Sequence, residues 1–512
     1  MQGQFQLQSA VVLGVEAKEV RVAVVVQDGL PGFTIVGMPD AAVRESQERV
    51  KSAIKACGFF FPNRKVVVNL APASLRKAGS GLDLPIAAAL LAATGQIAHD
   101  MASSYMMIGE LSLDGSIRAV HGALPCAILA RKLGLKFLFP KDTEDTIQLD
   151  GLQQYTIKRL SQLRDNDVLT FSHAVHNKPH KRIDFSDIQG HAGAKRALQI
   201  AAAGAHGVLM MGPPGSGKTM LASALPSILP PLDEESLLQA AVVHSVAGAD
   251  VTDILAGQRP FRHPHHSISS VGLVGGGNPI KPGEISLAHH GVLFLDELAE
   301  FKPAALQALR QPMESGTIVI TRANISTSLP AKFSLVAATN PCPCGYFGDP
   351  EHTCMCSQES IRRYQMRIGG PLLDRIDMHI DVMRLSSRDM FDTAPSTISS
   401  AILREGVLLA GEYRSWRISK EASEIEEQAG VHQQKSIATH AGIQKYLTQC
   451  HMNDATLAQF QQITHDQSLT TRAVVRILSV ARTIADIDQS WDTSLEHIME
   501  ACAFRLRAGL QL

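Results

Sequence analysis

The fold is decided by residues 207–225, which read GVLMMGPPGSGKTMLASAL. The apolar residues at 207–211 predict a buried strand, and residues 220–225 predict a helix. Glycines between them let backbone N–H groups turn inward around phosphate oxygens, while a lysine places positive charge on the β and γ phosphates and a threonine offers a hydroxyl to Mg²⁺. A plain glycine–proline turn would not require lysine followed by threonine. We therefore predict a phosphate-binding loop made of Gly212, Pro213, Pro214, Gly215, Ser216, Gly217, Lys218 and Thr219.

An acidic pair ends a second apolar strand farther along the chain. Residues 292–297 read VLFLDE, so the strand ends in Asp296 and Glu297. Because the carboxyl ends of parallel strands share one sheet edge, both acids are expected beside the phosphate loop. Asp296 would hold Mg²⁺ together with Thr219, and Glu297 would activate the attacking water.

A third apolar strand, predicted at 333–339, ends in Asn340. In an NTPase core, a polar side chain between the two motif strands can orient the attacking water. The alternative is a turn asparagine before Pro341.

Two arginines are candidates for contacting phosphates. Arg375 lies in PLLDRID at 371–377, where it could stabilise transition-state charge on a neighbouring subunit's nucleotide. Arg472 opens a helix predicted at 472–487 and could sense the γ-phosphate from a C-terminal lid. At each position the alternative is a solvated arginine.

Four of the eight cysteines form two close pairs, Cys342 with Cys344 and Cys354 with Cys356. Tetrahedral Zn²⁺ accepts four sulfurs, although the spacing within each pair is tighter than in most zinc sites. We predict a zinc site. The alternative is a set of reduced structural cysteines, with His352 as a substitute ligand.

Histidines and a hairpin complete the candidates. Residues 261–267 read FRHPHHS, and His289 and His290 follow farther along the chain. We interpret these histidines as loop residues rather than metal ligands.

Residues 316–324, GTIVITRAN, predict a hairpin that would project into the pore of a ring. Arg322 and Lys332 are then candidates for touching a threaded polymer, with solvated hairpin charges as the alternative.

With 512 residues, the chain exceeds what one hydrophobic core organises, and we predict an α/β multidomain fold. Valine-rich segments at 10–26 and 66–70 and a segment at 106–113 favour strands, while residues 40–57, 84–94, 192–203, 437–447 and 455–465 favour helices. The predicted parts are a mixed α/β domain at 1–171, a polar linker at 172–183, a nucleotide-binding α/β core with a cysteine insertion at 184–385, and a helical domain at 386–512.

Composition excludes some classes of partner and location. Hydrophobic residues make up 45% and charged residues 19%, which argues against long disordered regions. The net charge of −1 gives no global positive field, so any DNA contact must be local. The apolar segment at 84–93 is too short to span a bilayer and no leader pattern precedes it, so we expect a cytoplasmic protein without a membrane partner.

Over essentially its whole length, the chain resembles the magnesium-chelatase-like AAA+ family of bacteria, in its ComM or YifB type. The marks are GPPGSGKT at Gly212, PHHS at Pro264, GEISLAHHGVLFLDEL at Gly283, LRQPMESG at Leu309, AATNPCPCGYFGD at Ala337, GPLLDRID at Gly370 and ARTIADID at Ala481. So many long matches in one order are far more specific than a phosphate loop alone.

The resemblance implies an N-terminal domain with the fold of the Lon protease domain and ribosomal protein S5, a central AAA+ core and a C-terminal helical lid. It implies ATP and Mg²⁺ as cofactors, with Asn340 as sensor 1, Arg375 as arginine finger and Arg472 as sensor 2. It further implies a homohexameric helicase that drives branch migration of single-stranded and branched DNA during natural transformation, with recombination proteins as further partners.

One departure bears on a different activity. Lon-type proteases place a nucleophilic serine before an apolar helix, and in this chain Gly81 falls at that position. Leu124 falls where the partner lysine belongs, and the neighbouring Ser80 has no evident base. We therefore do not expect proteolysis or a protease-linked unfoldase. The remaining alternatives are the motor subunit of a magnesium chelatase acting on a tetrapyrrole partner, against which the extra N-terminal domain counts, and a remodelling factor acting on a protein.

Overall fold

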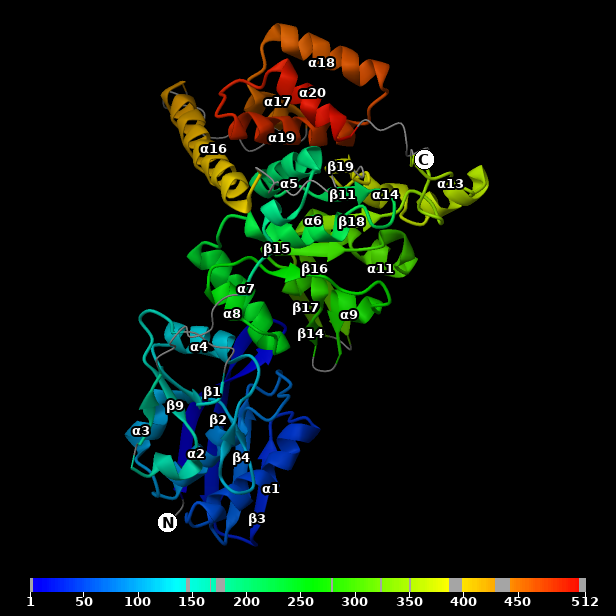
Figure 1. Cartoon of the computed structure of the whole chain (residues 1–512). Helices are drawn as coiled ribbons and strands as arrows, with labels where there is room; N and C mark the ends of the chain where they lie inside the picture. The colour runs from blue at the N-terminus through cyan, green and yellow to red at the C-terminus, as the bar shows by residue number, and fades with distance from the viewer. Residues whose placement is uncertain are drawn as a thin grey trace.

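The computed structural model describes residues 3–143, 148–165, 167–171, 180–277, 280–322, 325–349, 351–385, 398–428 and 443–505. Figure 1 shows an N-terminal α/β part in blue and cyan, a central α/β part mainly in green, and a helical C-terminal part in orange and red. Most of the predicted linker, and residues 437–442 of one predicted helix, lie outside the described residues. The chain is thus a mixed α/β multidomain protein with a helical C-terminal region.

The N-terminal part is built on two four-stranded sheets, ordered β1-β2-β4-β3 and β10-β9-β8-β5. The strands are β1 (Gly3–Leu13), β2 (Glu16–Gln27), β3 (Gly32–Val36), β4 (Lys65–Ala71), β5 (Tyr105–Met107), β6 (Glu110–Leu111), β7 (Ile117–Arg118), β8 (Lys136–Pro140), β9 (Gln154–Ile157) and β10 (Leu169–Thr170). The helices are α1 (Ala41–Ala56), α2 (Asp83–Ala93), α3 (His99–Ser104), α4 (Ala123–Lys132) and the 3-10 helix η1 (Leu160–Leu163).

Two strand predictions in this part need correction. The valine-rich segment at 10–26 is not one strand, because Gly14 adopts a left-handed φ of +64° and turns β1 back on β2. The segment at 106–113 is divided between β5 and β6, since Gly109 lies so close to Ile117 that a Cβ would be 2.7 Å from its Cγ2. In both places a glycine allows a close approach that the apolar pattern does not reveal.

The central part contains a five-stranded sheet ordered β12-β15-β18-β11-β19, in which all neighbouring strands are parallel. The strands here are β11 (Val208–Met211), β12 (Phe261–Arg262), β13 (Gly275–Gly276), β14 (Lys281–Pro282), β15 (Gly291–Leu295), β16 (Thr317–Arg322), β17 (Ile325–Pro330), β18 (Phe333–Thr339) and β19 (Met378–Asp381). The helices are α5 (Ala192–Gly204), α6 (Lys218–Ala224), α7 (Glu234–Ala247), α8 (Thr252–Leu255), α9 (Ser270–Val274), α10 (Glu284–Leu287), α11 (Pro303–Ala308), α12 (Arg310–Ser315), α13 (Gln358–Met366) and α14 (Gly370–Leu373), with the 3-10 helices η2 (Phe185–Asp187), η3 (Leu225–Ser227) and η4 (Leu298–Glu300).

Alternate residues of these strands enter two separate cores. Val208 and Met210 of β11 join a cluster with α5 and the C-terminal helices, whereas Leu209 faces a cluster formed by η4 and α11. Side chains of a strand alternate between its two faces, so a continuous apolar strand is expected when both faces are covered. The strands are apolar without interruption because both faces of the sheet are covered by helices.

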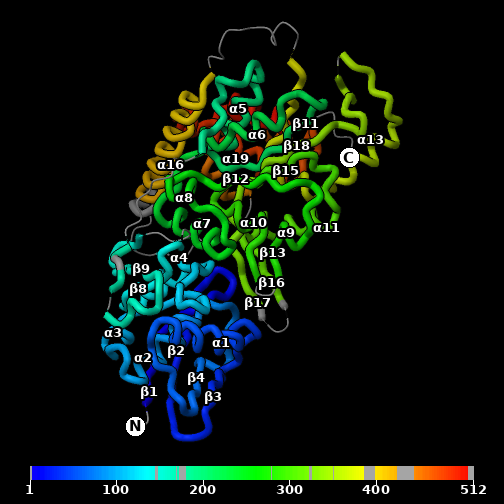
Figure 2. The backbone as a smooth tube through the Cα atoms, turned by 60° about the horizontal axis from the view of Figure 1, so that its bottom comes forward, coloured from blue at the N-terminus to red at the C-terminus, as the bar shows by residue number. Residues whose placement is uncertain are grey.

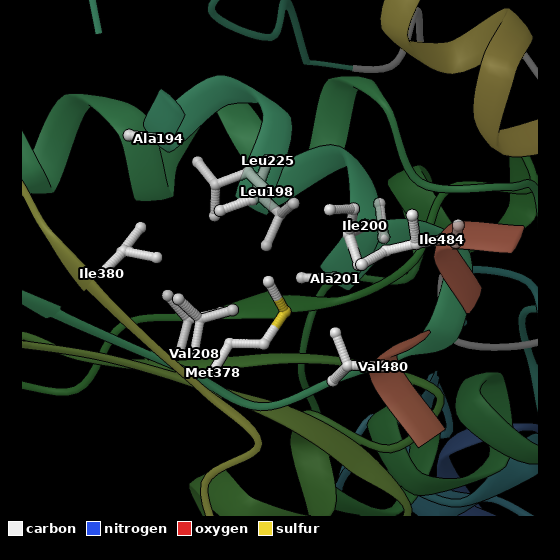
Figure 3. Packing of buried hydrophobic residues seen from close by; sticks show 14 of the residues in the cluster. Ala194, Leu198, Ile200, Ala201, Val208, Leu225, Met378, Ile380, Val480 and Ile484 are labelled. Carbon is white, nitrogen blue, oxygen red and sulfur yellow. The ribbon is translucent and has the colours of Figure 1, made fainter. Parts of the chain in front are cut away.

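The C-terminal helices are α16 (Ser400–Gln428), α17 (Ile443–Cys450), α18 (Asp454–Asp466), α19 (Thr471–Ile487) and α20 (Leu495–Ala503). Helix α19 begins at Thr471 because the preceding Thr470 side chain accepts a hydrogen bond from the backbone N–H of Ala473. Figure 3 shows Val480 and Ile484 of α19 packed near α5 and the sheet. The helical region therefore shares a core with the central part.

The N-terminal part contacts the central part at two places. Helix α4 packs against α7 in a shared apolar cluster that includes Leu124 and Ala241. The turn between β1 and β2 reaches the antiparallel hairpin β16–β17, against whose cluster Val15 packs. Figures 1 and 2 both place this hairpin on the side of the central part that faces the N-terminal part. Within the described residues, we find no helix long and apolar enough to cross a membrane.

Candidate active site

The phosphate-loop residues connect the carboxyl end of β11 to the start of α6. Gly215 and Gly217 have left-handed φ values of +77° and +86°, which direct the loop around its own backbone N–H groups. The hydroxyl of Ser216 is buried and has no hydrogen-bond partner among the described residues. A buried polar atom of this kind is expected where a bound ligand supplies the partner.

Lys218 points back into this loop. Its Nζ donates to the carbonyl oxygens of Gly212 and Pro213, each at 2.8 Å, and lies 3.3 Å from Oδ1 of Asn340. Burial lowers the pKa of Lys218 to about 8, against the opposing attraction of Asp296 and Glu297. The side chain is thus a buried cation held by weak neutral acceptors, which the stronger acceptors of a phosphate can replace.

The two acids follow β15, the next strand but one in the sheet. The Thr219 hydroxyl donates to Oδ2 of Asp296 at 2.7 Å, and Oδ1 of Asp296 accepts from the backbone N–H of Glu297 at 2.9 Å. Glu297 has a left-handed φ of +52°, which carries the chain sharply out of the strand. The structure therefore brings Lys218, Thr219, Asp296 and Asn340 together at one sheet edge.

His266 joins this group, although the sequence pattern pointed only to a loop histidine. Its Nδ1 lies 3.1 Å from Oε2 of Glu297. The contact arises because β12 pairs in parallel with β15, so the chain after β12 leaves the sheet at the same edge. The histidine-rich segment after a strand was the only signal in the sequence that could have indicated this contact.

The two candidate arginines lie at the opposite edge. Arg375 precedes β19 and pairs with Glu314 at 2.6 Å, and Arg472 lies 3.8 Å from the same carboxylate. Glu314 lines a cavity of about 490 Å³ beside Gly291 and Phe333, the first residues of β15 and β18. At about 3.3 Å per residue, the seven residues of β18 separate this edge from Lys218 by roughly 20 Å. Neither arginine is brought to the phosphate loop of its own chain.

The four candidate cysteines gather between β18 and α13. The sulfurs of these cysteines, Cys342, Cys344, Cys354 and Cys356, all lie within 4.8 Å of one another. The sulfurs of Cys342, Cys344 and Cys354 are 3.3 to 3.7 Å apart. A regular tetrahedron of sulfurs around zinc has edges of about 3.8 Å, given the usual Zn–S distance. The donor set and its size therefore fit Zn²⁺.

Three family models match the chain in sequence order. The model described as "Subunit ChlI of Mg-chelatase" matches residues 22–143, "Magnesium chelatase, subunit ChlI" matches 184–390, and "Magnesium chelatase, subunit ChlI C-terminal" matches 397–505. YifB of Escherichia coli is 39% identical over 96% of this chain and 95% of its own length. The competence protein ComM of Haemophilus influenzae is 38% identical over 97% of this chain and 96% of its own.

This chain belongs to the magnesium-chelatase-like family of ComM and YifB. A magnesium-chelatase 67 kDa subunit of Chlorobaculum tepidum is also similar, at 32% identity, but over only 31% of this chain and 23% of its own length. The similarity to ComM and YifB extends over all three parts of the molecule, whereas that to the chelatase subunit does not.

The histidine pair His289 and His290 of this ComM- and YifB-like chain lies away from the phosphate loop. His289 and His290 precede β15 at the amino edge of the sheet, where both ring Nε2 atoms lie near Oε1 of Gln239. Burial lowers the pKa of His289 to about 3, so its ring is neutral and its Nδ1 accepts from the backbone N–H of Lys332. This pair has a packing role in the structure.

The hairpin candidates occupy opposite ends of the hairpin. Strands β16 and β17 pair from Thr317 with Pro330 to Arg322 with Ile325, so Arg322 is near the tip, and its side chain lies outside the described part. Lys332 follows the hairpin at its base and lines the cavity near Glu314. Only Arg322 is therefore placed as a tip residue.

Ser80, which neighbours the position compared with a protease nucleophile, and Leu124, at the position compared with the partner lysine, both make other contacts. Ser80 donates its hydroxyl to the Glu110 carboxylate. The backbone N–H of Leu124 donates to the hydroxyl of Ser245 in the central part. Leu124 thus contributes to the contact between the N-terminal and central parts.

Proposed function

We propose that this protein is an ATP-hydrolysing motor that acts on DNA as a homohexameric ring. The observation that carries the proposal is the convergence of Lys218, Thr219 and Asp296 at the carboxyl edge of the parallel sheet. A buried cation, together with a hydroxyl and a carboxylate that are hydrogen-bonded to each other, matches the needs of a triphosphate and its metal ion.

Thr219 and Asp296 would hold Mg²⁺, and the phosphate loop with Lys218 would hold the phosphates. Both proposed ligands are oxygens, which Mg²⁺ prefers, and they lie 2.7 Å apart. When bound, Mg²⁺ neutralises charge on the phosphates. The unpartnered Ser216 hydroxyl supports a ligand in this loop.

Glu297 would accept a proton from the attacking water, and Asn340 would orient that water. Arg375 and Arg472 would act on the nucleotide of an adjacent subunit, as arginine finger and sensor 2, because both lie at the edge remote from their own Lys218. Hydrolysis would then depend on assembly, since each nucleotide needs residues from two chains.

The relative named competence protein ComM supports a role in the uptake of genetic material. We propose that ATP turnover drives branch migration of recombination intermediates, with single-stranded and branched DNA as partners and with recombination proteins beside them in the cytoplasm. Arg322 near the hairpin tip is the proposed DNA contact. A cation there suits a phosphate backbone without conferring sequence preference.

For the N-terminal part we propose the fold shared by the Lon protease domain and ribosomal protein S5, without proteolytic activity. The absence of proteolysis is supported by Gly81 and Leu124, because these two residues, at the positions of the nucleophile and its lysine, carry neither a hydroxyl nor an amine. At the four cysteines we propose one Zn²⁺ ion, supported by their sulfur distances.

The test compares ATP hydrolysis and migration of a synthetic four-way junction by the purified protein. We expect hydrolysis to rise with single-stranded or branched DNA, and we expect Lys218→Ala and Glu297→Gln to abolish both activities. Lys132→Ala, at an exposed position on α4, is the control and should retain both. An inability to hydrolyse ATP would refute the motor, and hydrolysis without any response to DNA would refute the DNA role.

The partial similarity to a chelatase subunit favours one second candidate, a motor that serves a metal-inserting enzyme on a tetrapyrrole. That candidate predicts retention of a tetrapyrrole-binding protein by the immobilised chain and no retention of DNA. A remodelling motor for proteins would instead show ATP turnover stimulated by a protein substrate.

A further inference from the structure

The four cysteines lie in a loop that directly adjoins the phosphate loop. We call residues 341–349 and 351–357, between β18 and α13, the cysteine loop. Its described residues contain no helix or strand, and Met355 within it is 90% exposed. Among its described apolar side chains, only those of Pro341 and Cys342 are buried. Such a segment has little apolar burial to fix its conformation, which is the usual reason for a bound metal.

The cysteine loop meets the phosphate loop at Gly345. This residue has a left-handed φ of +86°, and a Cβ on it would lie 2.5 Å from Cδ of Pro214. The backbone of the cysteine loop at Gly345 therefore packs directly against the ring of Pro214 in the phosphate loop. Any shift of the turn at Gly345 would either push on Pro214 or open a gap beside it.

Arg384 ties the same two loops together. Its Nη2 donates to the carbonyl oxygen of Pro214 at 3.1 Å, and its guanidinium lies over the ring of Tyr346, 5.4 Å from the centroid. Its Nε is also 3.8 Å from the carboxylate of Asp349, a side chain only 2% exposed. The position of Pro214 thus depends on three residues of the cysteine loop.

A further connection runs through the chain itself. Asn340, whose Oδ1 lies 3.3 Å from Nζ of Lys218, is separated from Cys342 by one residue. The carbonyl oxygen of that residue, Pro341, accepts a hydrogen bond from the buried Gln365 of α13. One ion held by the cysteines would therefore fix a segment that begins at a side chain of the nucleotide site.

We propose that a Zn²⁺ ion bound by Cys342, Cys344, Cys354 and Cys356 holds the cysteine loop against Pro214 and Asn340, so that occupancy of this metal site sets the affinity for nucleotide. The inference rests on the proposed nucleotide site. The ion would act on that site through the cysteine loop and would not contact the nucleotide itself.

The test combines metal analysis with nucleotide binding. The double variant Cys354→Ser, Cys356→Ser removes two sulfurs and changes no residue of the phosphate loop. We expect one zinc per wild-type chain by elemental analysis, none in the double variant, and a loss of affinity for a fluorescent ATP analogue on the order of tenfold or more. Cys57→Ser, a half-buried cysteine of the N-terminal part, is the matched control and should keep both zinc and affinity.

A second variant separates metal loss from loop displacement. Gly345→Ala keeps all four sulfurs and moves Pro214, so we expect zinc retention with weakened nucleotide binding. Combined with the double cysteine variant it should weaken binding little further, because both changes act through the same contact.

The outcomes of these measurements separate a failure of this inference from a failure of the proposed function. A zinc-free double variant that binds nucleotide as tightly as the wild type would overturn the inference, as would a wild-type chain without zinc. If the zinc-loaded wild type fails to bind nucleotide at all, the proposed function fails instead, so the two failures are distinguishable.

Discussion

We expect Lys218 to make nucleotide binding sensitive to alkaline pH. Burial places its pKa at about 8, so the free site loses its cation as the pH rises through that value. Phosphates favour the charged form, so binding above that pH must take up a proton. We expect the dissociation constant to be flat near pH 7 and to rise by up to about tenfold per pH unit above pH 8. Equilibrium binding of a fluorescent nucleotide measures this.

The Lys218→Arg variant provides the control for that profile, because a guanidinium stays charged throughout this range. Its affinity, whatever its absolute value, should be independent of pH from 7 to 9.5. An equally flat profile for the wild type would contradict the assignment of the phosphate contact to Lys218.

His266 is expected to position Glu297 for hydrolysis. Since its Nδ1 lies 3.1 Å from Oε2 of Glu297, removal of the ring frees the carboxylate. We expect His266→Ala to lower kcat by about tenfold with little change in KM, because the phosphate contacts stay intact. His266→Asn, which keeps an N–H donor, should recover part of the loss.

The neighbouring His265 gives a matched control, as its Nδ1 lies 2.8 Å from the Ser267 hydroxyl. His265→Ala should leave kcat close to that of the wild type. Equal effects of the two substitutions, or a change confined to KM, would show that the contact with Glu297 has no part in hydrolysis.

The sequence predicts those site residues that directly follow a recognisable strand of the parallel sheet. Lys218, Asp296 and Asn340 could be placed at one edge because each follows an apolar strand, and parallel strands end together. His266 could not, since β12 has only two residues and gives no periodic pattern. The ion pair of Arg375 with Glu314 was equally hidden, because it joins side chains that only tertiary packing brings together.

At the scale of elements, the β1–β2 turn is the contact through which the N-terminal part reaches the hairpin β16–β17. Gly14 lies against Thr327 of β17, so a side chain at Gly14 would collide with the hairpin. Gly134 has a similar left-handed φ, +69° against +64°, but no atom within 4 Å of a Cβ. Both glycines adopt a left-handed backbone conformation, but only Gly14 packs against a neighbouring side chain.

We expect Gly14→Ala to reduce the free energy of unfolding by about 1–3 kcal/mol more than Gly134→Ala, because only the first adds a steric clash to the backbone strain. Thermal unfolding of both variants measures the difference. Equal midpoints would mean that the turn does not press on the hairpin.

The element boundaries show why long apolar segments are easier to predict than turns within them. Strand β18 and helix α5 were predicted within one residue of their bounds, since each is a continuous apolar or periodic run. The strand character of the segment at 10–26 is confirmed, but its division into β1 and β2 could not be predicted, because the turn at Gly14 does not break the valine-rich pattern.

On the scale of the whole molecule, the five-stranded sheet has the phosphate loop and Asp296 at one edge, while Arg375 and Arg472 lie at the other. In a closed ring, the arginine edge of one subunit can meet the phosphate loop of the next, a head-to-tail contact that repeats around the ring. The chain in isolation instead pairs Arg375 and Arg472 with Glu314. In the ring that we propose, assembly would separate these pairs before the arginines could reach phosphate.

Mixing two inactive variants tests this arrangement most directly. A subunit with Arg375→Ala keeps Glu297, and one with Glu297→Gln keeps Arg375, so a competent site forms only where the two variants adjoin in the right order. We predict that each variant alone is inert and that an equal mixture regains about one quarter of wild-type ATP hydrolysis, the fraction of interfaces with that order in a random ring. A mixture as inert as its components, or full hydrolysis by Arg375→Ala alone, would contradict the account.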